Sequence, residues 1–218
     1  MRVWICASIS DFIMHAHAIN AFLRRLPPWP VYILGVLAIA AKIWLAASGH
    51  MGPDPVRTLE QELGRLGLQE LLAVMAITPL RRLSGISLLR FRRALALVAV
   101  FTIAAHLAVW LLLDVQGISA FWREIIKRPY ITVGMAAFIL MIPLAATSTN
   151  AAIRRMGARG WRRLHMLSYP VILLAGVHFI MLRKGWQAEP LFYMAAIMML
   201  LALRLPWSVR PPLRPRRG

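Results

Sequence analysis

The sequence predicts an all-α integral membrane bundle of six transmembrane helices, with both termini in the cytoplasm. Hydrophobic residues make up 60% of the 218 residues, whereas a soluble domain contains about 45–50%. These residues gather in runs close to the length of about 20 residues that a helix needs to cross a bilayer. The arginines lie in short clusters between the runs, as the positive-inside rule predicts.

The six expected spans alternate with polar loops. They are Val31–Ala47, Leu66–Leu80, Ala94–Leu113, Tyr130–Thr147, Leu164–Leu182 and Pro190–Leu205. Lys42 lies near the outer end of the first span, where a lysine can extend to the interface. The second span is the weakest, because Gln69 and Glu70 occupy its first turn. The fourth and fifth spans contain Pro143 and Pro170.

The charges predict the orientation of the bundle. The N-terminal segment, the loops after the second and fourth spans, and the tail together hold 18 of the 26 lysines and arginines. The opposite loops hold seven, and Lys42 lies within a span. The side with 18 cations is expected in the cytoplasm. Both termini then lie inside, which requires an even number of spans.

The chain is expected to divide into three segments. Residues 1–28 form a lead-in that is interfacial or poorly ordered, because Asp11 interrupts its apolar run and no clear site for signal-peptide cleavage follows. A misassigned start codon would also explain this segment. Residues 29–207 form the membrane domain. Residues 208–218 form a basic tail rich in proline and arginine, suited to contact with anionic lipid or to a simple positive-inside anchor.

Two classes of protein are disfavoured by composition. The net charge of +18 does not indicate nucleic acid as a partner, because no aromatic residues alternate with the basic clusters to form a continuous groove. The single cysteine, Cys6, cannot form an intramolecular disulfide, and one thiolate cannot hold a zinc or iron–sulfur site.

Three of the six histidines fall within expected spans, where an ionisable side chain is costly and indicates function. His106 and His178 lie on two spans that both run outward, and a rise of about 1.5 Å per residue puts both roughly 18–21 Å above the inner start. Two imidazoles at one depth on neighbouring helices can bind one haem iron axially, giving a low-spin centre suited to electron transfer. The alternative is that each histidine hydrogen-bonds a neighbouring helix.

His165 and Arg92 are candidates for a second, inner site. His165 lies 13 residues before His178, about 20 Å along the helix axis, which suits two redox centres stacked across a bilayer. The two rings are off a common face, and a kink at Pro170 would change their relation. Arg92 occupies the position expected for another inner ligand. Arginine does not normally bind iron, so it is either a partner for a haem propionate or an ordinary positive-inside residue.

Arg128 at the outer side has three interpretations. It is a bidentate clamp for an outer propionate, a docking charge for a periplasmic partner, or an interfacial anchor beside Tyr130. The remaining histidines, His15, His17 and His50, are expected to be solvated or interfacial.

A series of short motifs occurs in a characteristic order between about residues 50 and 182. The motifs are Gly52-Pro53-Asp54-Pro55-Val56, Thr78-Pro79-Leu80-Arg81, Arg92-Arg93, His106, Lys127-Arg128-Pro129-Tyr130-Ile131-Thr132-Val133-Gly134, Thr147-Ser148, Trp161 with Leu164-His165, and His178. In this order they resemble the MsrQ family, the haem-binding membrane subunits of bacterial methionine sulfoxide reductase systems. That family belongs to the ferric-reductase-like transmembrane group.

The resemblance implies a haem b protein of the bacterial inner membrane with one or two haems. It implies electron transfer to a periplasmic molybdenum-cofactor subunit that repairs oxidised methionines. The implied electron inputs are the quinol pool or a cytoplasmic flavin reductase, which makes quinone and FMN further candidate cofactors. His106, His165 and His178 match the family's haem histidines. The wider group has four such histidines, and the fourth position falls near Arg92.

Two rival functions are considered. A self-contained ferric reductase or NADPH oxidase needs a nicotinamide-binding domain, and no G-x-G-x-x-G stretch follows a strand here. The chain is therefore expected to be a redox subunit rather than a complete enzyme. A haem-free transporter or assembly protein would explain the spans but not the depth-matched histidines.

Overall fold

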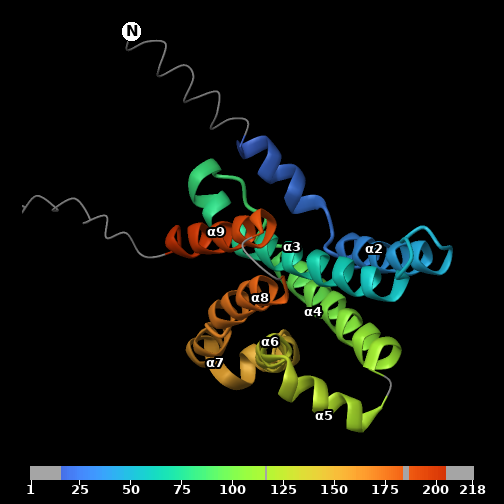
Figure 1. The fold of residues 1–218 in the computed structure, drawn as a ribbon. Helices are drawn as coiled ribbons and strands as arrows, with labels where there is room; N and C mark the ends of the chain where they lie inside the picture. The colour runs from blue at the N-terminus through green and yellow to red at the C-terminus, as the bar shows by residue number, and fades with distance from the viewer. Residues whose placement is uncertain (1–15, 116, 184–186, 205–218) are drawn as a thin grey trace, which may run out of the picture.

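The computed structural model describes residues 16–115, 117–183 and 187–204. Within these ranges every regular element is a helix and there is no strand. Residues 16–25 are helical. The elements that follow (Figure 1) are α2 (Trp29–Ala47), α3 (Pro55–Ser84), α4 (Arg92–Val109), the π-helix η1 (Trp110–Val115), α5 (Ile118–Lys127), α6 (Pro129–Ala146), α7 (Asn150–His165), α8 (Ser168–Leu182) and α9 (Ala188–Ala202).

Five helical segments among the described residues are long and apolar enough to cross a membrane. They are Trp29–Ala47, Pro55–Ser84, Arg92–Val115, Pro129–Ala146 and Asn150–Leu182. The helix α9 is apolar but shorter, at 15 residues. On α2 most large apolar side chains point away from the protein, and Leu34 and Val36 are 65% and 66% exposed. Such a surface is costly in water and favourable against lipid, so the chain is a multi-pass membrane protein.

The helix α3 is twice as long as the predicted second span. Its start is specified by Asp54, whose carboxylate accepts from the N–H of Arg57 at 3.1 Å, and by Pro55 in the first turn. It ends at Gly85, whose φ of 70° is the left-handed conformation that glycine adopts readily. The first 11 residues of α3 were expected to be loop because several are charged. They continue the helix instead, and two of them, Glu62 and Arg65, form ion pairs with Lys42 on α2 and Glu189 on α9.

The predicted fifth span is divided into two helices. The segment expected to be a cytoplasmic loop forms α7, and His165 is its last residue. A turn at Met166 and Leu167 precedes α8. The helix therefore breaks before Pro170, and not at it as predicted. Pro170 lies in the first turn of α8, where its missing N–H removes no helical hydrogen bond.

The helices pack as two close pairs, α3 with α4 and α6 with α8, and α9 lies against α8 and α3 (Figure 1). Helix α2 covers α4 and α3 on the other side. The largest buried cluster joins both pairs and α9. It contains Leu68, Leu71, Met75, Ala99, Met141, Val171, Ile172, Ile197 and Leu200. Residues 1–15 of the expected lead-in and the expected tail lie outside the described residues.

Candidate functional site

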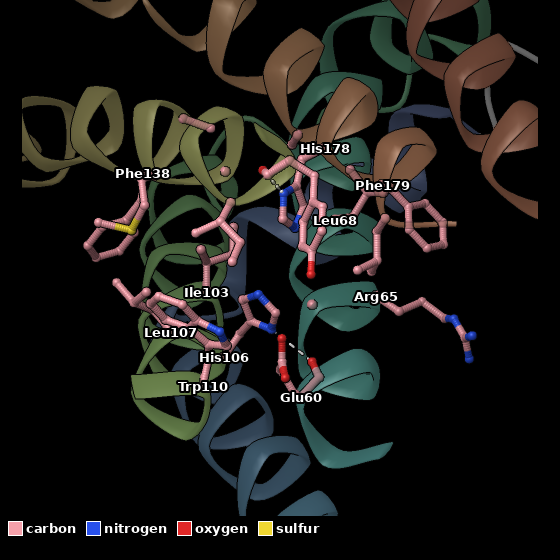
Figure 2. Close-up of a pocket in the computed structure, with 18 of the residues that line it drawn as sticks. Glu60, Arg65, Leu68, Ile103, His106, Leu107, Trp110, Phe138, His178 and Phe179 are labelled. Carbon is pink, nitrogen blue, oxygen red and sulfur yellow. Dashed lines mark hydrogen bonds between the residues drawn. The ribbon is translucent and has the colours of Figure 1, made fainter. Parts of the chain in front are cut away.

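His106 on α4 and His178 on α8 face one another across the predicted outer half of the bundle (Figure 2). Their ring centroids are 6.4 Å apart and their planes meet at 79°. The Nδ1 atom of His106 lies 2.8 Å from the main-chain oxygen of Glu60 on α3. The Nδ1 atom of His178 lies 2.7 Å from the main-chain oxygen of Tyr130 on α6. The equal depth predicted for these two histidines is therefore matched by direct proximity.

Both hydrogen bonds select the same tautomer. A carbonyl oxygen can only accept, so each Nδ1 donates a proton and each Nε2 keeps its lone pair. A donated Nδ1–H bond to a carbonyl is the usual way in which a metal-binding imidazole is oriented. Both rings are thus prepared to bind a metal through Nε2.

The spacing of the rings fits one metal ion between them. A metal–nitrogen distance of about 2 Å and a ring radius of about 1.2 Å predict centroids about 6.4 Å apart for two imidazoles on opposite sides of one ion. The measured separation is 6.4 Å. The distance also lies within the range of about 4.5–7 Å for edge-to-face ring pairs, so it is compatible with a shared metal ion and with a direct ring contact.

Two helical glycines make room for the histidine rings. A Cβ atom on Gly134 would lie 2.7 Å from Nδ1 of His178, and one on Gly64 would lie 3.1 Å from Nδ1 of His106. Each glycine is four residues after the carbonyl that its histidine contacts. The same local arrangement therefore occurs twice, once on α3 and once on α6. An isolated glycine within a helix commonly has a packing reason. The sequence therefore contained a signal for Gly64 and Gly134 as residues that pack against the site.

A cavity that is partly open to the surroundings lies around the two rings. Its wall is mainly apolar, with Leu68, Ile103 and Phe138 among the lining side chains (Figure 2). Charged lining residues are Glu60, Arg65 and Arg183. The two arginines were not identified as site residues from the sequence, because each falls in a stretch that resembles an ordinary loop or helix end.

A second cavity lies toward the predicted cytoplasmic side and brings His165 and Arg92 together in its lining. The ring of His165 stacks on Trp161, with centroids 3.8 Å apart and planes at 24°. Its Nδ1 lies 3.1 Å from the main-chain oxygen of Trp161. Five arginines line this cavity and none of its lining residues is acidic, so it is suited to a group with negative charge. They are Arg92, Arg93, Arg159, Arg162 and Arg163.

Arg128 lies outside the lining of both cavities. Its Nε is 2.7 Å from a carboxylate oxygen of Glu124, and its Nη1 donates to the hydroxyl of Tyr130 at 3.1 Å. The bond to Tyr130 raises the pKa of Arg128 above its usual value. Of the remaining histidines, His17 and His50 are exposed, and His15 lies outside the described residues.

The fold and the paired imidazoles define a class, that of helical membrane proteins with a half-buried pair of histidines. The family described as ferric reductase like transmembrane component matches residues 63–176. The chain is 43% identical over 191 residues to a protein of Brucella anthropi and to one of Brucella ovis. The aligned region covers 87% of this chain and 84% of each relative. Both relatives are named protein-methionine-sulfoxide reductase heme-binding subunit MsrQ. The chain therefore belongs to the MsrQ family, within the ferric reductase like transmembrane proteins. No solved structure matches it.

Proposed function

We propose that the chain is a membrane electron-transfer subunit in which His106 and His178 bind one b-type haem axially. The observation that carries this proposal is the separation of 6.4 Å between two rings whose Nδ1 atoms are both engaged by carbonyls. The relatives are named for haem binding, which agrees with this use of the site. When bound, haem supplies a one-electron redox centre.

The protein's own residues have three tasks at this site. The carbonyls of Glu60 and Tyr130 hold the two imidazoles in the ligating tautomer. Gly64 and Gly134 allow the rings to lie against the helices. The apolar wall keeps water away, and a dry, doubly ligated centre favours electron transfer over the binding of small ligands.

We further propose that His165 and Arg92 belong to an inner site through which electrons enter. Their shared cavity and its arginines support this role, because a haem propionate, or the phosphate of FMN, would find cationic partners there. A quinone is a third candidate occupant. The proposal covers one or two haems, with the quinol pool or a cytoplasmic flavin reductase as the electron donor.

The proposed acceptor is the periplasmic molybdenum-cofactor subunit of a methionine sulfoxide reductase system. The relatives are named as subunits of a protein-methionine-sulfoxide reductase. In this proposal the chain has six spans in the bacterial inner membrane, with α9 as the sixth and both termini in the cytoplasm. Arg128 remains a candidate for docking the acceptor or anchoring the chain, and its partners Glu124 and Tyr130 favour these roles over a propionate clamp.

The spectrum of the purified full chain tests the proposal. A Soret band that shifts on reduction with dithionite, together with at least one haem per chain by pyridine haemochrome, is the expected result. A colourless protein from haem-supplied cells would contradict the proposal and would favour a transporter or assembly protein.

A further inference from the structure

A chain of ion pairs runs along the predicted outer end of the histidine cavity. Lys42 contacts Glu62 at 2.6 Å, and Glu62 contacts Arg65 at 2.5 Å. The Nε atom of Arg65 lies 2.8 Å from Glu189, which also lies 3.9 Å from Nη2 of Arg183. The chain of ion pairs thus joins α2, α3, the end of α8 and α9. It contains three cations and two carboxylates, which leaves one positive charge in excess.

The two arginines of this chain are the arginines that line the histidine cavity. Arg65 directly follows Gly64, against which the ring of His106 lies. Arg183 is five residues after His178, just beyond the last turn of α8. Both cations therefore lie close in sequence to the contacts that hold the proposed ligands. Glu60, the acidic residue in the cavity lining, does not belong to the ion-pair chain.

Arg183 has donor capacity that the described residues do not use. Its Nε is buried and has no hydrogen-bond partner among them. Its contact with Glu189, at 3.9 Å, is too long for a hydrogen bond. A buried N–H of a charged group without an acceptor is costly. Because Arg183 also lines the histidine cavity, a carboxylate bound in that cavity could accept from this side chain.

We propose that Arg183 binds a propionate of the haem in the histidine cavity, and that Arg65 positions Arg183 through their shared partner Glu189. The inference rests on the proposed function, because it takes a haem between His106 and His178 as its ligand. A haem carries two carboxylates, and a guanidinium offers a carboxylate two parallel N–H donors. A positive charge at this position favours the reduced haem, which has one negative charge more than the oxidised form.

Three variants of the full-length haem protein test this inference. Arg183→Gln removes the charge, Arg183→Lys keeps the charge without the planar fork, and Glu189→Gln removes the carboxylate that Arg65 and Arg183 share. Arg128→Gln is the matched control, since Arg128 is also an outer arginine paired with a glutamate but lies outside the cavity lining. The readouts are the midpoint potential, followed by optical redox titration, and the rate of haem transfer to excess apomyoglobin.

Arg183→Gln is expected to lower the midpoint potential and to speed haem loss roughly tenfold, the effect of one charge-assisted hydrogen bond. Arg183→Lys should keep most of the potential but lose haem faster than the wild type. Glu189→Gln should also speed haem loss, because Arg183 loses the carboxylate that positions it, which tests the inference even if Arg183→Gln folds poorly.

The inference is overturned if Arg183→Gln and Arg128→Gln give the same potential and the same rate of haem loss. It is also overturned if Glu189→Gln leaves the rate of haem loss unchanged. A failure of the proposed function has a different signature, because the wild-type chain would then show no low-spin haem spectrum. A normal wild-type spectrum with indistinguishable arginine variants rejects the propionate contact alone.

Discussion

Arg204 donates two hydrogen bonds to the main-chain carbonyl oxygen of Met75, from Nε at 3.1 Å and from Nη2 at 2.8 Å. Met75 lies four residues before Pro79, which is inside α3 and has no N–H for that carbonyl. Arg204 follows α9 and supplies the donor that the proline removes. The helix α9 is thereby attached to a specific turn of α3, beside the inner cavity that Met75 also lines.

Replacing Arg204 with methionine is therefore expected to destabilise the protein by about 1–3 kcal/mol, because the Met75 carbonyl is left without a donor. In a Pro79→Ala background, the new N–H can satisfy that carbonyl, so the same replacement should cost less. Thermal unfolding in detergent of the four proteins gives the coupling energy. Equal costs in the two backgrounds would show that Arg204 does not compensate for the proline.

His106→Ala and His178→Ala are each expected to abolish the low-spin haem spectrum, because one axial ligand is lost in each. The fall in haem affinity should exceed the roughly 10–100-fold cost of removing an outer partner of a ligand. Haemochrome content per chain and the optical spectrum provide the measurement. His50→Ala is the control, since this exposed ring stacks on Trp44 far from the cavity lining. Full low-spin signal in both single variants would disprove the pairing.

Gly134→Ala should disturb the haem site more than Gly64→Ala. A methyl group on Gly134 would come 2.7 Å from Nδ1 of His178, whereas one on Gly64 would come 3.1 Å from Nδ1 of His106. Each ring must shift and strain its bond to the carbonyl. Gly160→Ala is a matched helical control, because its nearest new contact is at 3.8 Å. We expect the haem content to be highest in Gly160→Ala, lower in Gly64→Ala and lowest in Gly134→Ala. Equal haem contents would contradict the packing argument.

The angle of 79° between the His106 and His178 rings predicts an unusual EPR signal for the oxidised protein. Axial imidazoles in nearly perpendicular planes leave two iron d orbitals close in energy. The low-spin signal should therefore be highly anisotropic, with a large maximum g value. A rhombic signal of the kind that parallel imidazoles produce would mean that haem rotates one ring from the position described here.

His165→Ala should leave the signal of the His106–His178 haem intact, because its ring lines a different cavity and stacks on Trp161. Reduction from the cytoplasmic side should slow, or a second haem should be lost. Haem content and the rate of reduction separate these effects. Loss of the outer haem, with no second haem in the wild type, would instead indicate that His165 only orients the end of α7.

The sequence was sufficient to predict which two histidines lie at the same depth, because depth follows from the rise per residue alone. The rise per residue put His106 and His178 at one level, and the structure brings their rings within 6.4 Å. Rotation about the helix axes could not be predicted in this way. The contacts with the carbonyls of Glu60 and Tyr130, and the arginines of the cavity wall, depend on which helix faces which.

Hydropathy also failed to find two helical segments. The start of α3 carries Arg57, Glu60 and Glu62, and such a stretch is not apolar enough to be recognised as membrane helix. The signals at Asp54 and Pro55 were nevertheless those of a helix start. The sequence of α7 is rich in arginine, so its mean hydropathy is that of a loop. A helix at a membrane surface needs only one apolar face, and the average over the segment does not reveal such a face.

The two close helix pairs have a consequence for the degradation of the protein in the cell. His106 belongs to the α3–α4 pair and is bonded within it, and His178 is bonded within the α6–α8 pair. Contacts between α4 and α6, and between α3 and α8, are much sparser. Besides the buried cluster and α9, an iron held by both imidazoles would add a further link between the two pairs. Chains made during haem shortage lack it, so membrane proteases should remove them first and the amount of the protein should follow haem supply.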